Sequence, residues 1–345
     1  MQVFIYEHLV AHGWPQLNVE RRQGQSLLRE GAAMLSRLAT DFSEVDGVQV
    51  ATVQNCDASE LSLPRQCRVH ELLGNERVWP KIASLAVTAD WTVVIAPETG
   101  GVLSRICREL RHAGARLLMP NDDFIEIASN KHETAQWLTA AGIRAPRGIA
   151  LEVGTALPDD FPYPAVLKPR DGAGSEGVRL VRTSREVNAI ARPSRLERFQ
   201  EGLAASVAVL CGPAATRILP ACEQRLSRDG TFQYRGGRLP LEPQLAERAA
   251  RLAQQVVGRL PAALGYLGID IVLGGDPAGT DDTVIEINPR LTTSYVGLSA
   301  ALPMNLPKIM LLLAGGGSPG CVREAEPLEF EADGTIHFTA PTATP

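Results

Sequence analysis

Two apolar stretches, ALGYLGIDIVLGG and TVIEINPR, constrain the fold more than any other part of the sequence. Residues 268–273 and 283–288 have the pattern of strands, and the turn-rich GGDPAGTDD between them predicts an antiparallel hairpin. Asp270 lies on the first strand, and Glu286 and Asn288 lie on the second. An exposed edge strand would explain the alternation, but not an asparagine followed directly by proline, both of which are unfavourable in strands. The composition therefore favours a ligand site on the polar face.

Alternation places the two isoleucines of VIEIN on one face, and Val284 with the polar residues on the other. If Leu273 pairs with Thr283, Asp270 lies directly opposite Glu286. Opposed Cβ atoms are about 4.5 to 5.5 Å apart, so two carboxylates repel unless a cation lies between them. Two acids and an amide oxygen suit Mg²⁺ completed by water and phosphate oxygens, with Mn²⁺ as a second candidate. The hairpin therefore predicts a metal site for a magnesium nucleotide.

A glycine-rich segment, DGAGSEG, follows the strand-like AVLKP and places Gly172, Gly174 and Gly177 in the spacing G-x-G-x-x-G. A dinucleotide fold would need a helix after the last glycine, whereas VRLV predicts a strand. A protein-kinase loop would need its lysine on the next strand, and the Walker pattern is absent. A phosphate-cradling loop preceded by Lys168 and a loose hairpin turn without a ligand both remain open.

Lysine is rare in this chain, which uses arginine for most of its 34 basic residues. Lys131 begins NKHETAQWLTAAGI, a predicted amphipathic helix, and Lys168 precedes the glycine-rich segment. Lysine acts as a compact charge on phosphate, whereas Arg290, just after the second hairpin strand, can supply a planar fork. For Lys131, a solvated position at a helix start is equally open. The lysines are therefore candidate phosphate contacts.

The first 120 residues alternate strand-like stretches (VFIY, VQVATV, TVVIAP and ARLLMP) with the helix-like LLREGAAMLSRLA and LSRICRELRHAG. This pattern predicts a doubly wound α/β unit, whose ligands lie beyond the carboxyl ends of the strands. Glu7 follows the first strand, and Glu98 and Thr99 follow TVVIAP. The acids at these ends would suit a substrate ammonium group. For Glu98, a helix-capping role is an equal alternative.

The order and spacing of these motifs resemble the ATP-grasp superfamily from about residue 121 to residue 315. The motifs are SNKHETAQWL, DGAGSEG, GYLGIDIV and VIEINPR. More narrowly, GYLGIDIVL and VIEINPRLTTSYVGL, with PETGG and SLLREGAAML, resemble the tyramine–glutamate ligase family of methanofuran and methylofuran biosynthesis.

This resemblance implies an α/β protein with an N-terminal doubly wound (pre-ATP-grasp) domain and a two-lobed α+β ATP-grasp domain. The implied boundaries are residues 1–120 for the first domain and 121–315 for the second. The second divides into a glycine-loop lobe, 121–195, and a metal-site lobe, 196–315. Residues 316–345 would form a C-terminal tail, because they have no clear periodicity.

The implied activity is ATP-dependent amide formation between a carboxylate, that of glutamate, and a tyramine- or tyrosine-like amine. The reaction would pass through an acylphosphate and release ADP and phosphate. A phosphotransferase on the same scaffold and a non-catalytic nucleotide sensor are the alternatives. The intact set of metal-site residues and Arg290 argues against the sensor, whereas these motifs do not separate ligase from kinase.

Roles for individual residues also follow from the resemblance. Lys131 and Lys168 would contact nucleotide phosphates, and Lys168 and Arg290 would stabilise the transferring phosphoryl group. The family's hinge glutamate falls at Arg198, so Glu197 or Glu201 would replace it. The loop residues expected around the phosphates are Gly172, Gly174, Ser175 and Gly177. The residues expected at the substrates are Glu7, Glu98, Thr99, Thr292, Thr293 and Ser294.

Charge and composition exclude several classes of partner. The net charge is −5, and no basic run with interleaved aromatics predicts a nucleic-acid surface. No signal peptide or membrane span is recognisable. The six cysteines lack C-x-x-C spacing, which favours reduced thiols and a cytoplasmic location. The expected partners are therefore a small-molecule acid and a small-molecule amine, with a homodimer left open.

Overall fold

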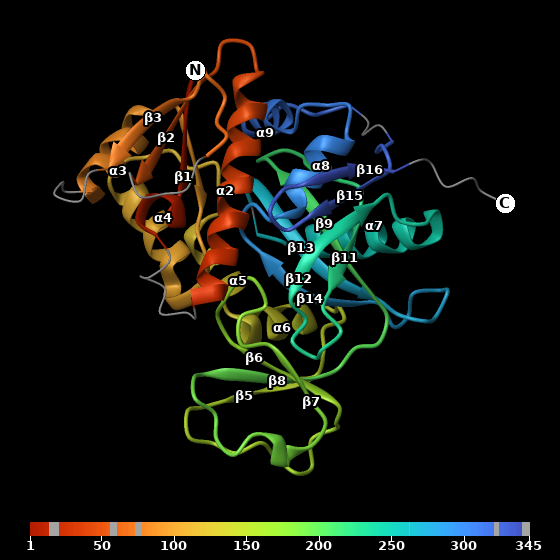
Figure 1. Ribbon diagram of the computed structural model, residues 1–345. Helices are drawn as coiled ribbons and strands as arrows, with labels where there is room; N and C mark the ends of the chain where they lie inside the picture. The colour runs from red at the N-terminus through yellow and green to blue at the C-terminus, as the bar shows by residue number, and fades with distance from the viewer. Residues whose placement is uncertain (14–20, 56–60, 73–77, 262, 321–323, 340–345) are drawn as a thin grey trace.

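The computed structural model describes residues 1–13, 21–55, 61–72, 78–261, 263–320 and 324–339. The described residues form three sheets (Figure 1), and the N-terminal sheet contains four parallel strands in the order β3-β2-β1-β4. These strands are β1 (Gln2–Glu7), β2 (Gln49–Asn55), β3 (Arg68–Leu72) and β4 (Trp91–Ile95). The strand order reverses between β1 and β4, and ligands bind beyond the carboxyl ends at such a switch point. Glu7 and the segment with Glu98 lie there.

The helices of this domain are α1 (His8–His12), α2 (Arg21–Ser43), α3 (Val78–Thr88), the 3₁₀ turn η2 (Thr99–Gly101) and α4 (Val102–His112). Three of the four predicted strands are confirmed. The prediction for ARLLMP is wrong, because only Leu117 forms an isolated bridge, to Thr92, before Pro120 ends donation. Helices α1 and α3, strand β3 and helix α5 (Asp122–Ser129) were not predicted. Strand β3 is largely exposed and polar, and Asn121 caps α5 directly after Pro120.

The smallest sheet forms a separate lobe at the bottom of Figure 1. Its strands are β5 (Gly148–Leu151), β6 (Ala165–Pro169), β7 (Arg179–Val181) and β8 (Ser194–Arg198), in the order β5-β8-β6-β7. The short 3₁₀ turn η3 (Ser184–Glu186) precedes β8. Because β8 pairs with β5 and β6, this lobe extends to Arg198. A boundary at residue 195 would cut that strand, so the predicted lobe boundary is corrected by a few residues.

The largest sheet is antiparallel and has the strand order β14-β13-β9-β11-β12-β15-β16, with β10 paired to β9. Its strands are β9 (Leu203–Cys211), β10 (Thr216–Ile218), β11 (Cys222–Leu226), β12 (Tyr234–Leu239), β13 (Gly265–Leu273), β14 (Thr283–Asn288), β15 (Leu328–Glu331) and β16 (Ile336–Phe338). Helices α6 (Lys131–Ala140) and α7 (Pro243–Val257) share one apolar core with this sheet. Helices α8 (Ser294–Ala301) and α9 (Leu306–Ala314) lie in the other large core, with the N-terminal domain.

The two cores explain the alternation along β9. Val207 and Val209 lie in the core beneath α7, whereas Ala208 and Leu210 lie in the core with α8 and α9. Nearer its start the strand lines a cavity with Ala204 and Ser206.

Among the described helices, no single one is long and apolar enough to span a membrane, although α8 and α9 qualify together despite a 102° bend between them.

The predicted C-terminal tail is wrong for residues 328–338, which form β15 and β16 of the large sheet. Phe330 is fully buried. A Cβ added at Gly237 or Gly297 would lie 2.6 Å or 2.3 Å from its ring, so both glycines make room for that ring. The two strands are only four and three residues long, which is too short to show periodicity in the sequence.

The hairpin of β13 and β14 is confirmed, and Asp270 pairs with Glu286. The predicted pairing of Leu273 with Thr283 is wrong, because Val272 holds that position. A β-bulge after Asp270 absorbs the difference of one residue. The bulge also changes the predicted faces. Val284 lies with Ile287 in the apolar core, whereas Ile285 lines a cavity together with Glu286 and Asn288.

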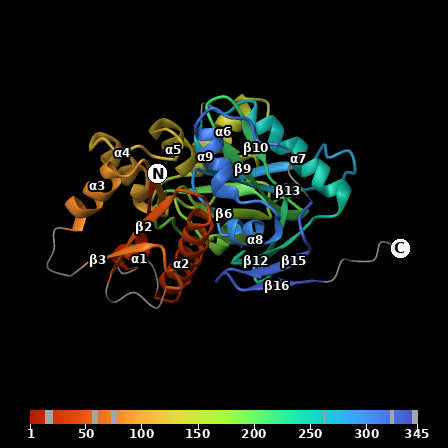
Figure 2. The same ribbon diagram turned by 90° about the horizontal axis from the view of Figure 1, so that it is seen from above.

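Helix α2 lies between the N-terminal sheet and the C-terminal half of the chain in both views (Figures 1 and 2). Asp41, which is 2% exposed, joins it to α8. The Tyr295 hydroxyl donates to Asp41 Oδ2 at 2.5 Å, and Ser299 Oγ donates to the same oxygen. Arg37 Nε lies 3.0 Å from Oδ1. Both carboxylate oxygens therefore have donors, although burial still raises the pKa of Asp41.

Candidate active site

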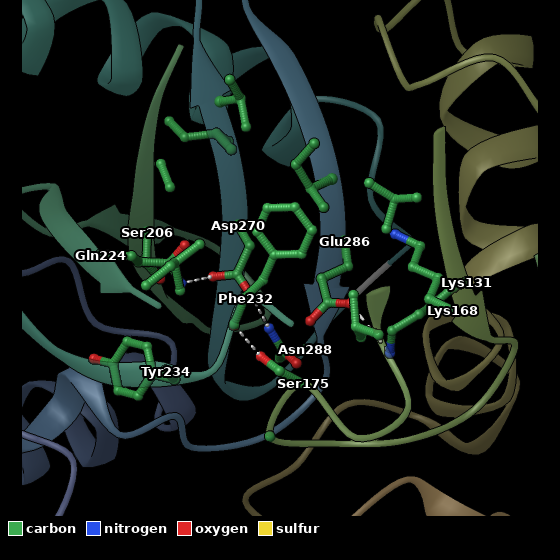
Figure 3. Close-up of a pocket in the computed structure, with 18 of the residues that line it drawn as sticks. Lys131, Lys168, Ser175, Ser206, Gln224, Phe232, Tyr234, Asp270, Glu286 and Asn288 are labelled. Carbon is green, nitrogen blue, oxygen red and sulfur yellow. Dashed lines mark hydrogen bonds and ion pairs between the residues drawn. The ribbon is translucent and has the colours of Figure 1, made fainter. Parts of the chain in front are cut away.

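The acid pair of the hairpin lies in the wall of a cavity of about 720 Å³ (Figure 3). Asp270 Oδ1 accepts a hydrogen bond from Gln224 Nε2 at 2.9 Å, and Oδ2 accepts one from Asn288 Nδ2 at 3.0 Å. Glu286 Oε2 lies 3.1 Å from Lys131 Nζ. The three predicted metal-site residues are therefore together, and Gln224 on β11 joins them without having been predicted.

The pKa values of the two acids are shifted in opposite directions. Burial, followed by the charge of Glu286, raises the pKa of Asp270. Burial would also raise the pKa of Glu286, but the charges of Lys131 and Lys168 outweigh that effect and lower it. Because the two carboxylates face each other, one negative charge opposes the other until a cation is added.

The donor set fits a hard divalent cation. Within the described part of the chain, no three His, Cys, Asp or Glu side chains form a cluster that could hold a metal ion. This set instead comprises two carboxylates and the amide of Asn288, so a cation there would take its remaining ligands from water or from a bound anion. Mg²⁺ commonly binds in this way, with few protein oxygens.

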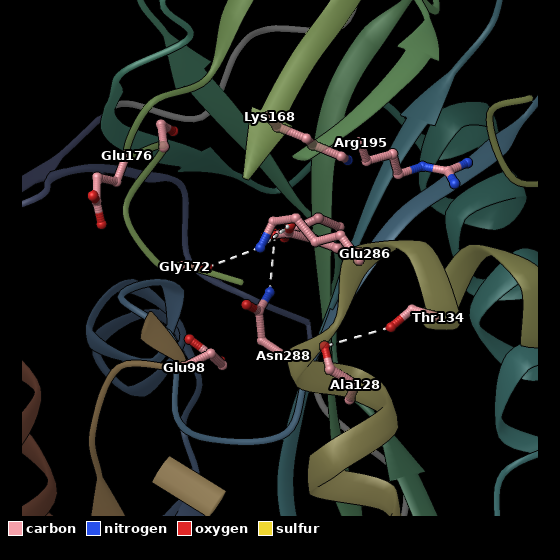
Figure 4. Close-up of polar contacts among 12 residues, drawn as sticks. Glu98, Ala128, Thr134, Lys168, Gly172, Glu176, Arg195, Glu286 and Asn288 are labelled. Carbon is pink, nitrogen blue, oxygen red and sulfur yellow. Dashed lines mark hydrogen bonds and ion pairs between the residues drawn. The ribbon is translucent and has the colours of Figure 1, made fainter. Parts of the chain in front are cut away.

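The two predicted phosphate lysines reach this region from different elements (Figure 3), and Figure 4 shows Lys168 with Arg195 and Glu286. Lys131, at the start of α6, donates from Nζ to the carbonyl oxygen of Gly172 at 2.8 Å. Lys168, on β6, is 3% exposed, and its Nζ lies 2.6 Å from Glu197 Oε1. Arg195 Nε lies 2.7 Å from the other oxygen of Glu197. Both lysines line the cavity, and each is held by a carboxylate.

The glycine-rich loop forms the edge of the cavity. Gly174 has a φ of 65°, which favours glycine, and a Cβ there would lie 2.7 Å from Leu27 Cδ2, so the leucine side chain would have to move. Ser175 also has a positive φ, of 60°, and its hydroxyl donates to the Phe232 carbonyl oxygen at 2.7 Å. The N-terminal domain contacts the same loop, because Gly100 N donates to Asp171 Oδ2 at 2.7 Å.

The other end of the cavity is apolar. Phe199, in the connection between β8 and β9, stacks on Phe232 with ring centroids 6.0 Å apart. Val166 and Leu203 line the same cavity with them. Sequence reasoning missed both phenylalanines, although Phe199 lies within the expected hinge. The apolar surface is of the kind that a planar base could occupy.

Arg290 connects the hairpin to the N-terminal domain. Its Nη2 donates to Glu98 Oε2 at 2.8 Å, and its Nη1 donates to the Leu291 carbonyl oxygen at 3.0 Å. Arg290 Nε and Glu98 Oε1 are buried and have no hydrogen-bond partner among the described residues. Glu98 forms no side-chain cap on the following turn. The capping alternative is therefore not what the structure shows.

The hydroxyl residues after Arg290 also face the cavity. Thr293 Oγ1 donates to Glu30 Oε2 at 3.2 Å, and the Thr292 and Ser294 hydroxyl oxygens are 2.8 Å apart. Tyr266 OH lies 3.1 Å from the Thr292 hydroxyl. Glu30, on α2, was not predicted. Its only sequence signal is an acid on the polar side of a long amphipathic helix.

Five predicted site residues do not line this cavity: Gly177, Glu201, Glu7, Glu98 and Thr99. Glu201 is exposed, and Thr99 Oγ1 lies 3.5 Å from Glu176 Oε2 in the loop. Glu7 is 2% exposed and caps α1 by accepting from Val10 N at 2.6 Å. Burial raises the pKa of Glu7 to about 8.

Comparison with known proteins agrees with this geometry. Residues 128–294 match the family model of the ATP-grasp domain, and residues 48–123 match that of the pre ATP-grasp 3 domain. The chain belongs to the ATP-grasp superfamily, and it is an ATP-dependent ligase of the carboxylate–amine class.

Among relatives, the chain is similar to tyramine–L-glutamate ligase of Methanocaldococcus jannaschii, with 22% identity over 86% of this chain and 84% of that protein. An ATP-grasp superfamily protein from Archaeoglobus fulgidus superposes with a TM-score of 0.72 at 19% identity, covering 96% of this chain and 92% of the other. The biotin carboxylase domain of Hydrogenobacter thermophilus 2-oxoglutarate carboxylase, crystallised with MgADP, gives a TM-score of 0.68 at 16% identity, with 95% and 73% covered.

Proposed function

We propose that the chain joins the carboxylate of glutamate to a tyramine- or tyrosine-like amine, with ATP converted to ADP and phosphate. The observation that carries the proposal is the convergence on one cavity of an opposed acid pair, two lysines and a partly unpaired arginine. Such a set fits phosphoryl transfer, in which the protein mainly positions groups and stabilises charge.

Three side chains would hold Mg²⁺, namely Asp270, Glu286 and Asn288, and the ion would neutralise charge on the nucleotide phosphates. Lys131 and Lys168 would release part of their contact with Glu286 and Glu197 and bind phosphate oxygens. The base would lie against the apolar end with Phe199 and Phe232. The glycine-rich loop would close over the phosphates with its backbone amides.

The reaction would proceed in two displacements. A carboxylate oxygen attacks the γ-phosphorus, the bond to the bridging oxygen of ADP breaks, and an acylphosphate forms. The amine nitrogen then attacks the acyl carbon, phosphate leaves with the bonding electron pair, and the nitrogen loses a proton. Arg290 supports both steps, because its unpaired Nε can stabilise an oxyanion without first breaking a protein contact.

The substrate assignment rests on similarity and on the polar groups near Arg290. The relative from M. jannaschii is named for glutamate and tyramine. Thr292, Thr293 and Ser294 can orient a carboxylate beside Arg290, which Glu98 holds in place. Both substrates would then meet where the N-terminal domain adjoins the hairpin.

The test is a complete reaction with omission controls. Glutamate, tyramine or tyrosine, ATP and Mg²⁺ should give ADP and a product with the summed mass of acid and amine less water, whereas omission of any one component should give no amide. Mn²⁺ can replace Mg²⁺ in a parallel reaction. If another acid forms an amide and glutamate does not, the glutamate assignment is wrong. ADP release with a phosphorylated product and no amine dependence would indicate a phosphotransferase.

A further inference from the structure

A second cavity, of about 1120 Å³, lies against the glycine-rich loop. Its wall comprises the start of α2, the loop itself, the segment before β8 and the start of β12. Glu30, Tyr234 and Ser175 line both this cavity and the one that contains the acid pair. The two cavities are therefore adjacent, with the glycine-rich loop and Glu30 at their boundary.

Arginine dominates the charge of the second cavity. Four arginines line it, each from a different segment of the chain: Arg29, Arg179, Arg192 and Arg235. The only acids in its wall are Glu30 and Glu176. The chain as a whole has a net charge of −5, so this local excess of positive charge does not follow from its composition.

Few protein groups compensate these arginines. Arg192 Nη1 lies 2.6 Å from Glu176 Oε1, which pairs one arginine with one acid of the wall. Within the described residues, Arg29, Arg179 and Arg235 have no ion-pair partner, and Arg235 only donates to Gln233 Oε1 at 3.3 Å. An isolated exposed arginine is ordinarily a solvated side chain. Several from separate elements around one cavity produce a positive potential that attracts an anion.

Glu30 connects this positive cavity to the reacting end of the first one. It accepts from Thr293 Oγ1 at 3.2 Å and from Ser26 Oγ at 3.4 Å, so both of its oxygens already face polar groups. The charge of Arg290 acts on it as well. A carboxylate in that position can bind an ammonium group beside Arg290. The arginines of the second cavity line the same wall as Glu30, on the other side of the boundary.

We infer that the amine substrate is itself anionic: its ammonium group binds at Glu30, and a carboxylate or phosphate group that it carries lies in the arginine-lined cavity. The planar forks of Arg29 and Arg235 would recognise that anion. This inference rests on the proposed function, because it takes the acceptor to be an amine. It favours tyrosine, or an amine that bears a phosphate, over tyramine.

The test compares three amines with the same ring: tyramine, L-tyrosine and tyramine O-phosphate. Their binding to the full chain is measured by calorimetry with Mg²⁺ and a non-hydrolysable ATP analogue present, so no turnover is required. We expect at least one anionic amine to bind about tenfold or more tightly than tyramine. L-tyrosine and tyramine O-phosphate separate a carboxylate from a phosphate as the preferred anion.

The double variant Arg29→Gln/Arg235→Gln should abolish that preference and leave tyramine and the ATP analogue unaffected. Both positions are exposed, so folding should persist. The matched control Arg251→Gln/Arg259→Gln removes the same charge from exposed positions outside both cavities, and should retain the preference.

Equal binding of all three amines by the wild type, or no binding of any, overturns the anionic-amine site. A uniform loss for all three in the double variant also overturns it, because the arginines would then act on the loop. If the preference holds but no amine yields an amide with glutamate, the proposed reaction fails while the anion site stands.

Discussion

Two acidic sites in this molecule differ in what lies opposite the carboxylate. Asp41, between α2 and α8, is closed from solvent, and both of its oxygens have donors from Tyr295, Ser299 and Arg37. Asp270 is half-buried in the cavity wall and faces a second carboxylate, that of Glu286. Burial raises the pKa of Asp41 and of Asp270 alike. A raised pKa therefore does not separate them, and neither do hydrogen-bond donors, because Gln224 and Asn288 donate to both oxygens of Asp270. The difference is the second carboxylate, which faces Asp270 and has no counterpart at Asp41 among the groups that bind it.

The largest effect should come from Glu286→Gln, which keeps the shape of the side chain and removes its charge. We expect ADP release to fall at least a hundredfold, a change of about 2.7 kcal/mol in barrier, because a hard anionic ligand is lost. The variant also loses the ion pair with Lys131, so activity is expressed per folded molecule. Glu247→Gln, at an exposed position of α7, is the control. Retention of more than about a tenth of the activity, under ~1.4 kcal/mol, would contradict the metal assignment.

Asp41→Ala should have the opposite signature. Removal of the carboxylate leaves the Tyr295 and Ser299 hydroxyls without their acceptor and Arg37 without its counter-charge, so the free energy of unfolding should fall by about 2 to 4 kcal/mol. Activity per folded molecule should stay within about threefold, roughly 0.7 kcal/mol, of the wild type. Denaturant unfolding and ADP release measure the two quantities, with Asp46→Ala as an exposed control. A loss of activity as large as that of Glu286→Gln would remove the distinction between the clusters.

Glu7 extends this comparison of acidic side chains to the pH dependence of stability. Its folded pKa is raised from 4.5 to about 8 by burial, so the folded protein binds the proton more tightly than the unfolded chain does. The stabilisation is fully present below pH 4.5 and is lost as pH rises through 8. The thermal midpoint should therefore decline over this range, and Glu7→Gln should decline less. Glu44→Gln, at an exposed position, should follow the wild type. Identical slopes for wild type and Glu7→Gln would show that Glu7 is charged in the fold.

The smallest effect concerns the glycine-rich loop. Magnesium nucleotide should slow backbone hydrogen exchange in residues 171–178 by about tenfold, because the loop amides would acquire phosphate acceptors. Exchange in the part of α2 around Asp41 should not change, since its partners are already in place. Mass spectrometry of peptic fragments gives both values in one experiment. Equal protection of the two regions would indicate a general tightening rather than phosphate binding at the loop.

The sequence predicted the hairpin and its acid pair well, because alternation and turn composition are local signals. It failed on the register, since nothing local marks Ile285 as the extra residue of a bulge. The bulge is what allows Val284 to face the core while Glu286 faces the cavity. The predicted pairing of Asp270 with Glu286 is therefore confirmed, although the predicted pairing of Leu273 with Thr283 is wrong.

Contacts between distant segments were the other part that the sequence could not supply. Gln224, Phe232 and Glu30 reach the cavity from β11, the turn before β12, and α2, and each belongs to an unremarkable local pattern. Glu98 was found because it follows a strand end, but its pairing with Arg290 joins positions 192 residues apart. Only the packing of the N-terminal domain against the hairpin determines that contact.

The burial of Phe330 has a consequence for shortened forms of the protein. Its strand, β15, covers the edge of β12, and β16 in turn covers β15. A chain ending at residue 327 would uncover a row of unpaired N–H and C=O groups on β12, beside the apolar hollow left at Gly237 and Gly297. Bare sheet edges of this kind recruit strands from other molecules. Such a truncation should therefore precipitate or form oligomers by edge-to-edge pairing, even though it removes none of the residues assigned to nucleotide, metal or substrate.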